Sequence, residues 1–136
     1  MPQTGLRVFL DANVLFSAAH RENAGLGTLW KLQEVQLLTS LYAIQEAANN
    51  LATEDQRARL RQLLEDVETV EAVLDLDATL PAGLPEKDRP ILGAAAGAKA
   101  DFFLTGDAKH FGAYFGKIVC GVRVERPAEF LRLAGR

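Results

Sequence analysis

Two aspartates follow short apolar segments of the chain in positions suited to metal-ion chemistry. Asp11 comes directly after Leu6–Leu10, and Asp107 comes shortly after Phe102–Leu104. The apolar residues of both segments run together instead of alternating, as in parallel strands covered on both faces. Ligands of open parallel sheets bind outside the carboxyl ends of the strands. We therefore expect these two carboxylates to lie close together at one edge of the sheet.

Two further acids are candidates for the same site. Glu46 lies in the middle of a predicted helix among small and polar neighbours, and Asp88 lies at the start of another. Each has a simpler interpretation, because an isolated helical Glu is usually solvated and Asp88, like Asp11 and Asp107, suits a helix N-cap. A carboxylate has two oxygens, so capping and metal binding are compatible. Glu86 is an alternative to Asp88 in the same role.

Convergent carboxylates suit hard divalent cations. Mg²⁺ prefers oxygen ligands, usually takes one or two carboxylates and keeps several waters. Bound ions activate an attacking water, hold a phosphate and stabilise the leaving oxygen. We therefore expect the four acids to hold Mg²⁺ or Mn²⁺ and to support hydrolysis of phosphate esters. Asn13 and Thr105, near the two strand ends, are expected to bind a metal water or to orient a carboxylate.

Strand and helix patterns alternate along the chain, which predicts a parallel sheet flanked by helices. Strands are expected at Leu6–Leu10, Gln36–Thr39, Val70–Leu74, Phe102–Leu104 and Val119–Val124. Helical patterns cover Asn13–Ala19, Gly25–Glu34, Leu41–Leu51, Glu54–Asp66, Asp88–Lys99 and Pro127–Leu133, with a short helix or turn at Asp107–Tyr114. The predicted fold class is α/β, a three-layer sandwich with a parallel sheet of about five strands, in a single domain spanning residues 1–136.

The composition of the 136-residue chain bounds its class. Hydrophobic residues make up 49% and charged residues 24%, as in ordinary soluble domains. No apolar run reaches the roughly 18 residues of a membrane span, and the N-terminus lacks a signal-peptide pattern, so we expect a cytoplasmic protein without a membrane partner. The lone cysteine, Cys120, excludes an internal disulfide and is expected to be a small buried hydrophobic residue.

Other kinds of site lack their sequence signature. Neither of the glycine-rich phosphate-binding motifs, G-x-G-x-x-G and G-x-x-x-x-G-K-[ST], occurs in the chain. His20 and His110 lack the spacing of zinc ligands with Cys120. Ser17 and Ser40 are not in a G-x-S-x-G setting, which argues against a serine hydrolase.

The net charge of −3 conflicts with nucleic-acid binding by charge alone. Bound cations would offset part of the carboxylate charge, and local basic side chains could supply the rest. Arg57 and Arg61 share one helix face, and together with Lys109 they are candidates for contact with nucleic acid. Simple solvation of the helix is the competing interpretation for the two arginines, because Glu54, among other acids, lies close in sequence. A basic partner protein is another source of neutralisation.

Four segments resemble the motifs of the PIN-domain family, specifically its toxin-like, VapC-type members. They are Val8–Ala18, Thr39–Ser40 with Glu46, Asp88–Ala95, and Ala100–Asp107, and the ending Val122–Leu133 is also similar. The first and fourth segments are the more specific. The resemblance implies a metal-dependent endoribonuclease whose acidic quartet is Asp11, Glu46, Asp88 and Asp107. It also implies the toxin of a toxin–antitoxin pair, acting on RNA, often homodimeric and silenced by a small antitoxin protein.

Two other functions stay open at this point. One is a PIN-like module that binds RNA or protein with weak or absent turnover. The other is a different α/β hydrolase that handles phosphate compounds, such as a phosphatase. Convergence of the four acids in space would favour an enzyme over a binding module.

Overall fold

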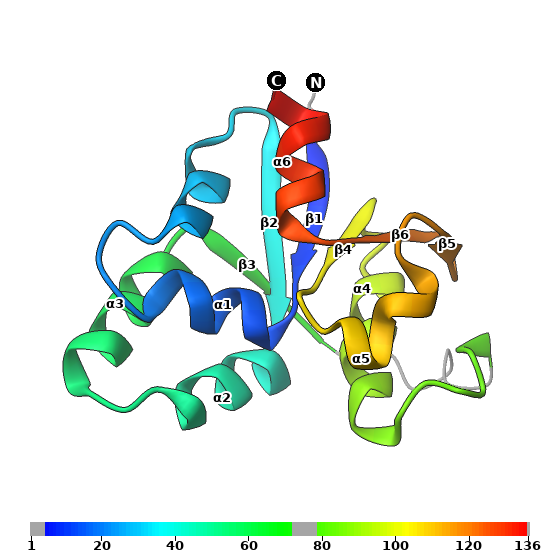
Figure 1. The fold of residues 1–136 in the computed structure, drawn as a ribbon, viewed down its shortest axis with the longest axis horizontal. Coiled ribbons are helices and arrows are strands. Elements are labelled where there is room, and N and C mark those ends of the chain that lie inside the picture. The colour runs from blue at the N-terminus through cyan, green and yellow to red at the C-terminus, as the bar shows by residue number, and fades with distance from the viewer. Residues whose placement is uncertain (1–4, 72–78, 136) are drawn as a thin grey trace.

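The computed structural model describes residues 5–71 and 79–135, which form a six-stranded sheet flanked by helices (Figure 1). The strands are β1 (Leu6–Leu10), β2 (Val35–Ser40), β3 (Val67–Val70), β4 (Phe102–Leu104), β5 (Ile118–Val119) and β6 (Val122–Glu125). They lie in the order β3-β2-β1-β4-β6-β5, and every pair is parallel except the antiparallel pair β5–β6. The predicted α/β class is confirmed.

The helices connect the strands in two directions along the sheet. They are α1 (Ala12–Ala19), η1 (Gly25–Lys31), α2 (Leu41–Asn50), α3 (Glu54–Leu64), η3 (Glu86–Asp88), α4 (Arg89–Gly97), α5 (Ala108–Phe111), η4 (Gly112–Tyr114) and α6 (Pro127–Gly135). Here α1 lies on the connection from β1 out to β2, whereas α4 lies on the connection from β3 back to β4. Because such crossovers are right-handed, α1 and α4 cover opposite faces. In Figure 1, α6 crosses in front of β1 and β2.

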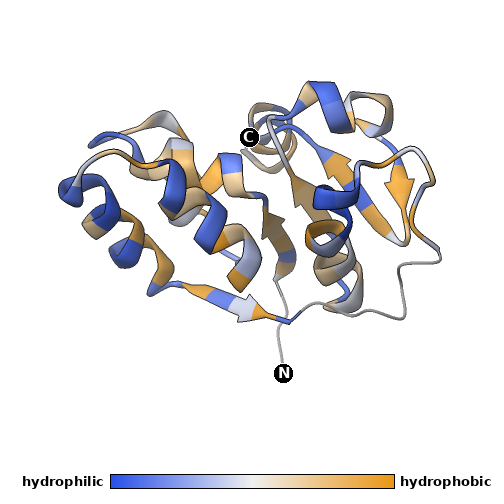
Figure 2. Cartoon of the chain, turned by 90° about the horizontal axis from the view of Figure 1, so that it is seen from below, coloured by the Kyte–Doolittle hydropathy of each residue, from blue (hydrophilic) through white to orange (hydrophobic). Residues whose placement is uncertain are grey.

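The strand pair β1–β4 forms the centre of the core and ends at the site. Phe9 and Phe103 are paired across these strands, are fully buried, and stack with ring centroids 5.7 Å apart. The next pair, Leu10 and Leu104, is also fully buried. Figure 2 shows hydrophobic residues along the central strands and hydrophilic residues on the outer turns of the helices. Tight packing fixes the two strands against each other, and with them the residues that follow.

The predicted fifth strand, Val119–Val124, is wrong in one respect: it is a hairpin of β5 and β6. The connecting residues, Cys120 and Gly121, have φ angles of +53° and +84°. A two-residue loop with both φ angles positive is the turn whose twist suits a tight hairpin. Cys120 is therefore a half-buried turn residue instead of a buried hydrophobic residue, and its Sγ donates to the carbonyl oxygen of Thr79 over 3.3 Å.

Two other elements differ from the sequence prediction. The segment after Asn23 forms a 3-10 helix, η1, instead of an α-helix. The third strand begins at Val67, earlier than predicted, because its pairing with β2 starts at Leu37. Residues 72–74 of the predicted strand lie outside the described residues. No helix among the described residues combines the length and apolar character that a bilayer crossing requires.

Candidate metal centre

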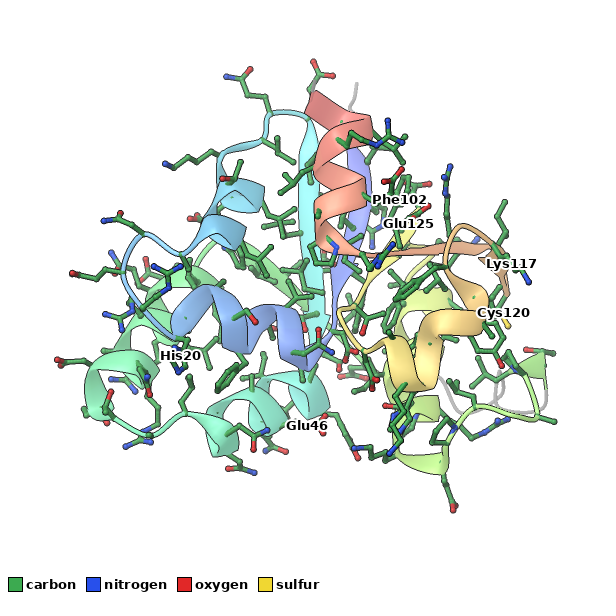
Figure 3. The ribbon with its side chains drawn as sticks, in the orientation of Figure 1. His20, Glu46, Phe102, Lys117, Cys120 and Glu125 are labelled. Carbon is green, nitrogen blue, oxygen red and sulfur yellow. The ribbon has the colours of Figure 1, made fainter. Side chains whose placement is uncertain are left out.

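A pocket of about 680 Å³ lies at the carboxyl ends of the central strands, and all four predicted acids line it. Asp11 and Asp107 enter from the loops that follow β1 and β4, which are neighbours in the sheet. Glu46 comes from α2, where it is half-buried, and Asp88 comes from the end of η3. Figure 3 shows Glu46 on the helix below the end of β2. The fold thus brings together side chains that are far apart in sequence.

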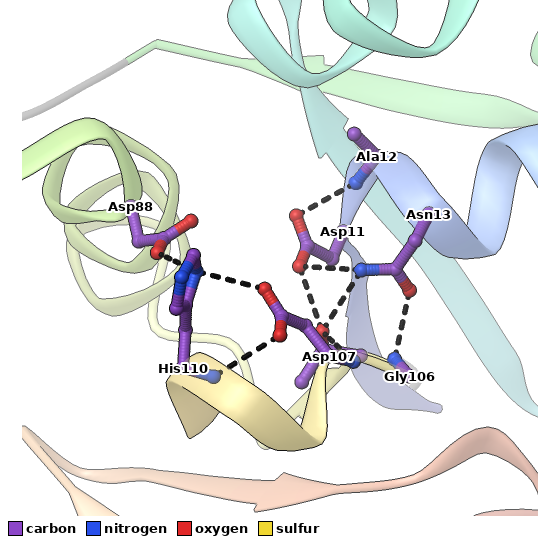
Figure 4. Close-up of polar contacts among 8 residues, drawn as sticks. Asp11, Ala12, Asn13, Asp88, Gly106, Asp107 and His110 are labelled. Carbon is purple, nitrogen blue, oxygen red and sulfur yellow. Dashed lines mark hydrogen bonds and ion pairs between the residues drawn. The ribbon is translucent and has the colours of Figure 1, made fainter. Parts of the chain in front are cut away.

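Asp11 is buried, and three donors hold its carboxylate. Its Oδ1 accepts from the backbone nitrogen of Ala12 over 2.7 Å, so it caps α1. Its Oδ2 accepts from Thr105 Oγ1 over 2.8 Å and from Asn13 Nδ2 over 3.1 Å (Figure 4). Burial, with smaller contributions from the charges of Asp88 and Glu46, raises the pKa of Asp11 to about 6, and the hydrogen bonds from Thr105 and Ala12 oppose this rise. The capping and pocket interpretations therefore both hold.

Asn13 and Thr105 tie together the loops that follow β1 and β4. Asn13 Oδ1 accepts from the backbone nitrogen of Gly106 over 2.7 Å, and its Nδ2 also donates to Thr105 Oγ1 over 3.1 Å. Thr105 is fully buried, and its Oγ1 also accepts from the backbone nitrogen of Asp107 over 3.1 Å. Both residues therefore orient the Asp11 carboxylate, which is one of the two supporting roles expected of them.

Asp88 and Asp107 meet at a residue that the sequence prediction left out of the site, His110. The Nδ1 atom of His110 is 2.9 Å from Oδ2 of Asp88 and 2.9 Å from Oδ2 of Asp107. Asp107 Oδ1 accepts from the backbone nitrogen of His110 over 3.0 Å and so caps α5. The side chain of Asp88 is buried and makes no capping hydrogen bond to α4. Desolvation raises the pKa of Asp88, opposed by the charge of His110 and reinforced by that of Asp107.

Glu86, the alternative to Asp88, is exposed and is not among the residues that line the pocket. The turn of η3 directs Asp88 inward, whereas Glu86 faces solvent. The same turn brings Lys87 to the pocket lining, a basic residue that the sequence prediction missed. Glu125 is another buried acid at a strand end, but it accepts from Arg123 Nε and Nη2 over 2.9 and 2.8 Å, so its charge is already paired.

The basic side chains predicted to contact nucleic acid lie outside this pocket. Arg61 Nη2 pairs with Glu54 Oε2 over 2.7 Å on the surface of α3. Arg57 Nη1 donates to the carbonyl oxygen of Leu51 over 3.0 Å. Both arginines therefore make contacts within α3 and the turn before it, while Lys109 is exposed on α5.

The donor set fits a divalent cation. Asp88, Asp107 and His110 each offer one ligand atom, and these atoms lie within 4.8 Å of one another. Asp88 Oδ2 is buried and makes no hydrogen bond within the described part of the chain. A buried carboxylate oxygen without a donor carries a large desolvation cost, which a cation would relieve.

Comparison with known proteins places this site in a family. A model of the PIN domain matches residues 7–109, most of the chain. The chain belongs to the PIN-domain family. This PIN domain has the fold of a solved structure, VapBC2 from Rickettsia felis bound to a DNA fragment from their promoter, with a TM-score of 0.68. The identity is 13%, over 89% of this chain and 98% of that chain. A search of curated proteins finds no significant match to this PIN domain.

Proposed function

We propose that this PIN domain is an endoribonuclease dependent on Mg²⁺ or Mn²⁺, which hydrolyses RNA phosphodiester bonds at the acid-lined pocket. The observation that carries the proposal is the convergence of Asp11, Glu46, Asp88 and Asp107 around one pocket. Aspartates that only cap helices need not lie near one another, whereas the ligands of one metal centre must lie around the same pocket. Membership in the PIN-domain family supports the same reading.

The carboxylates of the pocket would hold divalent ions, and these ions supply an activated water and neutralise the phosphate and the leaving oxygen. Asp11 is held by Thr105, Asn13 and the first turn of α1, and its Oδ1, which accepts a single hydrogen bond, keeps a lone pair for an ion. Preorganised ligands of this kind need no rearrangement when charge develops. Asp107 caps α5 through Oδ1, so its Oδ2, which lies 2.9 Å from His110 Nδ1, takes no part in the cap.

Glu46 and Lys87 have different parts in the proposal. Glu46 is half-buried on α2 and shares the pocket with Asp11, whose pKa it helps to raise. We assign it to the pocket's ligand set, where it would hold an ion or position a water. The ammonium of Lys87 would contact an RNA phosphate beside the scissile one, since Lys87 is the basic residue among the described residues that line the pocket.

The same comparisons also bear on the partners. We propose that the domain is the VapC-type toxin of a toxin–antitoxin pair, with a small antitoxin protein as partner and a homodimer as its assembly. The likeness to the fold of VapBC2 supports this, as do the motifs in the sequence. Leu41 and Tyr42 at the start of α2 are exposed by 60% and 43%, which gives an apolar surface near the pocket for such a partner.

A cleavage assay with matched variants tests the proposal. The purified protein is incubated with RNA, single-stranded DNA and a phosphomonoester in Mn²⁺, Mg²⁺ or EDTA, beside Asp11→Asn and Glu86→Gln. We expect RNA cleavage that EDTA and Asp11→Asn abolish and that Glu86→Gln, an exposed neighbour of the pocket, leaves unchanged. RNA binding without cleavage would identify a binding module, and phosphate release from the monoester alone would identify a phosphatase. Either result would overturn the proposal.

A further inference from the structure

The imidazole of His110 reaches both Asp88 and Asp107 with the same ring nitrogen (Figure 4). Its Nδ1 is 2.9 Å from one carboxylate oxygen of each residue. Despite these short distances, neither Nδ1 nor Oδ2 of Asp88 achieves hydrogen-bond geometry with any group in the described residues, and both atoms are buried. Buried polar atoms in native proteins are nearly always paired, so these two atoms call for a third group beside them that binds both.

The spacing of the three atoms suits ligands of one metal ion. Adjacent ligands of an octahedral ion, each about 2.1 Å from it, are about 3.0 Å apart. The two N···O distances of 2.9 Å match that separation. The Asp88 side chain, 9% exposed, is aimed into this cluster, and its Oδ2 makes no hydrogen bond to the described residues.

The local backbone fixes this arrangement. Asp107 Oδ1 accepts from the backbone nitrogen of His110, which closes the first turn of α5 and sets the ring beside the other carboxylate oxygen. Phe111, the next residue, is fully buried and packs on Phe103 with ring centroids 5.0 Å apart, so the turn is anchored in the core. His110 is therefore held in place by the buried Phe111 as well as by the Asp107 cap.

We infer that His110 is a direct ligand of the metal ion through Nδ1, together with Asp88 and Asp107, so that the centre has mixed nitrogen and oxygen ligands. This inference rests on the proposed function, which requires that the pocket bind a divalent ion. Mg²⁺ takes oxygen ligands, whereas transition ions accept imidazole nitrogen. The site should therefore prefer Mn²⁺ to Mg²⁺ more strongly than an all-carboxylate site does.

Pulsed electron paramagnetic resonance of the Mn²⁺-loaded protein tests this ligand directly. The chain has two histidines, His20 and His110, so the exposed His20 provides the matched control. We expect electron spin-echo modulation from a coordinated imidazole ¹⁴N in the wild type and in His20→Gln, and its loss in His110→Gln. In titration calorimetry, His110→Gln should weaken Mn²⁺ binding by about ten-fold or more and Mg²⁺ binding by less.

The other outcomes separate this inference from the proposed function. Bound Mn²⁺ without imidazole modulation would overturn the inference and leave the proposed function standing. Tighter Mn²⁺ binding by His110→Gln would overturn it as well, because the imidazolium would then be a counter-ion that occupies the metal's place. Absence of Mn²⁺ binding by the wild type would overturn both. The wild-type spectrum needs no variant, so a folding defect in His110→Gln would not weaken the test.

Discussion

Thr105 Oγ1 donates a hydrogen bond of 2.8 Å to Asp11 Oδ2, joining the ends of the two central strands inside the protein. Neither group faces solvent, since Thr105 is fully buried and Asp11 is 4% exposed. The bond stabilises the charged form of Asp11 against the burial that disfavours it. The orientation and the ionisation of the first predicted metal ligand therefore depend on a neighbouring strand.

Replacing Thr105 with valine, of nearly the same shape, tests this dependence. Thr105→Val should raise the pKa of Asp11 further, lower Mn²⁺ affinity at neutral pH by about ten-fold, and cost about 1–3 kcal/mol of unfolding free energy. Calorimetric titration and chemical denaturation measure the two effects. Thr39→Val is the control, because Thr39 is equally buried and donates to the carbonyl oxygen of Leu10 over 2.9 Å, outside the pocket lining. Equal losses of Mn²⁺ affinity in both variants would contradict the assigned role.

The contribution of Asp11 to the stability of the metal-free protein should fall as pH rises between about 4 and 6. Burial raises the pKa of Asp11 from 3.8 to about 6, so in this window the folded state binds more protons than the unfolded state. The shift of about two units corresponds to roughly 3 kcal/mol lost across the window, and the raised pKa of Asp88 acts in the same direction. Denaturation in EDTA at several pH values should show this slope, shallower in Asp11→Asn. An equally steep slope in that variant would contradict the assignment.

Neutralising Asp88 should separate stability from activity. Burial raises the pKa of Asp88 in spite of the opposing charge of His110, so Asp88→Asn removes a costly buried charge and should leave the unfolding free energy of the metal-free protein equal or higher. RNA cleavage should fall roughly 100-fold because a ligand is lost. Cleavage rates and denaturation midpoints measure both. Glu86→Gln, two residues earlier and exposed, should change neither property. Loss of cleavage in Glu86→Gln alone would assign the ligand to Glu86.

The contact with RNA should depend on the basic residue in the pocket lining. Lys87→Gln should raise the KM for RNA several-fold with a smaller change in kcat. The slope of the logarithm of the RNA-binding constant against the logarithm of the salt concentration should fall by about one, as for the loss of one phosphate contact. Arg61→Gln is the comparison, because Arg61 pairs with Glu54 outside the pocket. If Arg61→Gln raised the KM for RNA more than Lys87→Gln did, the RNA would bind to the helix face that carries Arg57 and Arg61, and the role assigned to Lys87 would be wrong.

Whether a site residue could be predicted from the sequence depends on the element that carries it. Asp11 and Asp107 could be placed together because strand ends converge by a general rule of parallel sheets. Asp88 was predicted with Glu86 as an alternative, because the side chain that faces the pocket depends on the rotation of the 3-10 turn η3, which no periodicity encodes. His110 follows Asp107 by three residues, and that spacing in a capped turn is the signal that would have pointed to it.

The elements of the fold likewise divide into those that the sequence predicted and those that it did not. The strands β1 and β4 were recognisable because the apolar residues 8–10 and 102–104 run together, and the alternation of strands and helices predicted a parallel sheet that contains both. The hairpin at Cys120 was not, because its tight turn places a cysteine at positive φ, where the usual asparagine or aspartate signal is missing. The boundaries of β3 likewise depend on its pairing with β2 and not on its own short sequence.

Anomalous diffraction from a crystal containing Mn²⁺ is the most direct test of the metal centre on which the proposed activity depends. The account predicts a Mn²⁺ peak in the pocket, within bonding distance of Asp88 and Asp107 and sharing the site with Asp11. The account would be contradicted if the pocket contained no Mn²⁺ peak and its carboxylates were hydrogen-bonded only to protein groups, or if Mn²⁺ bound elsewhere on the surface.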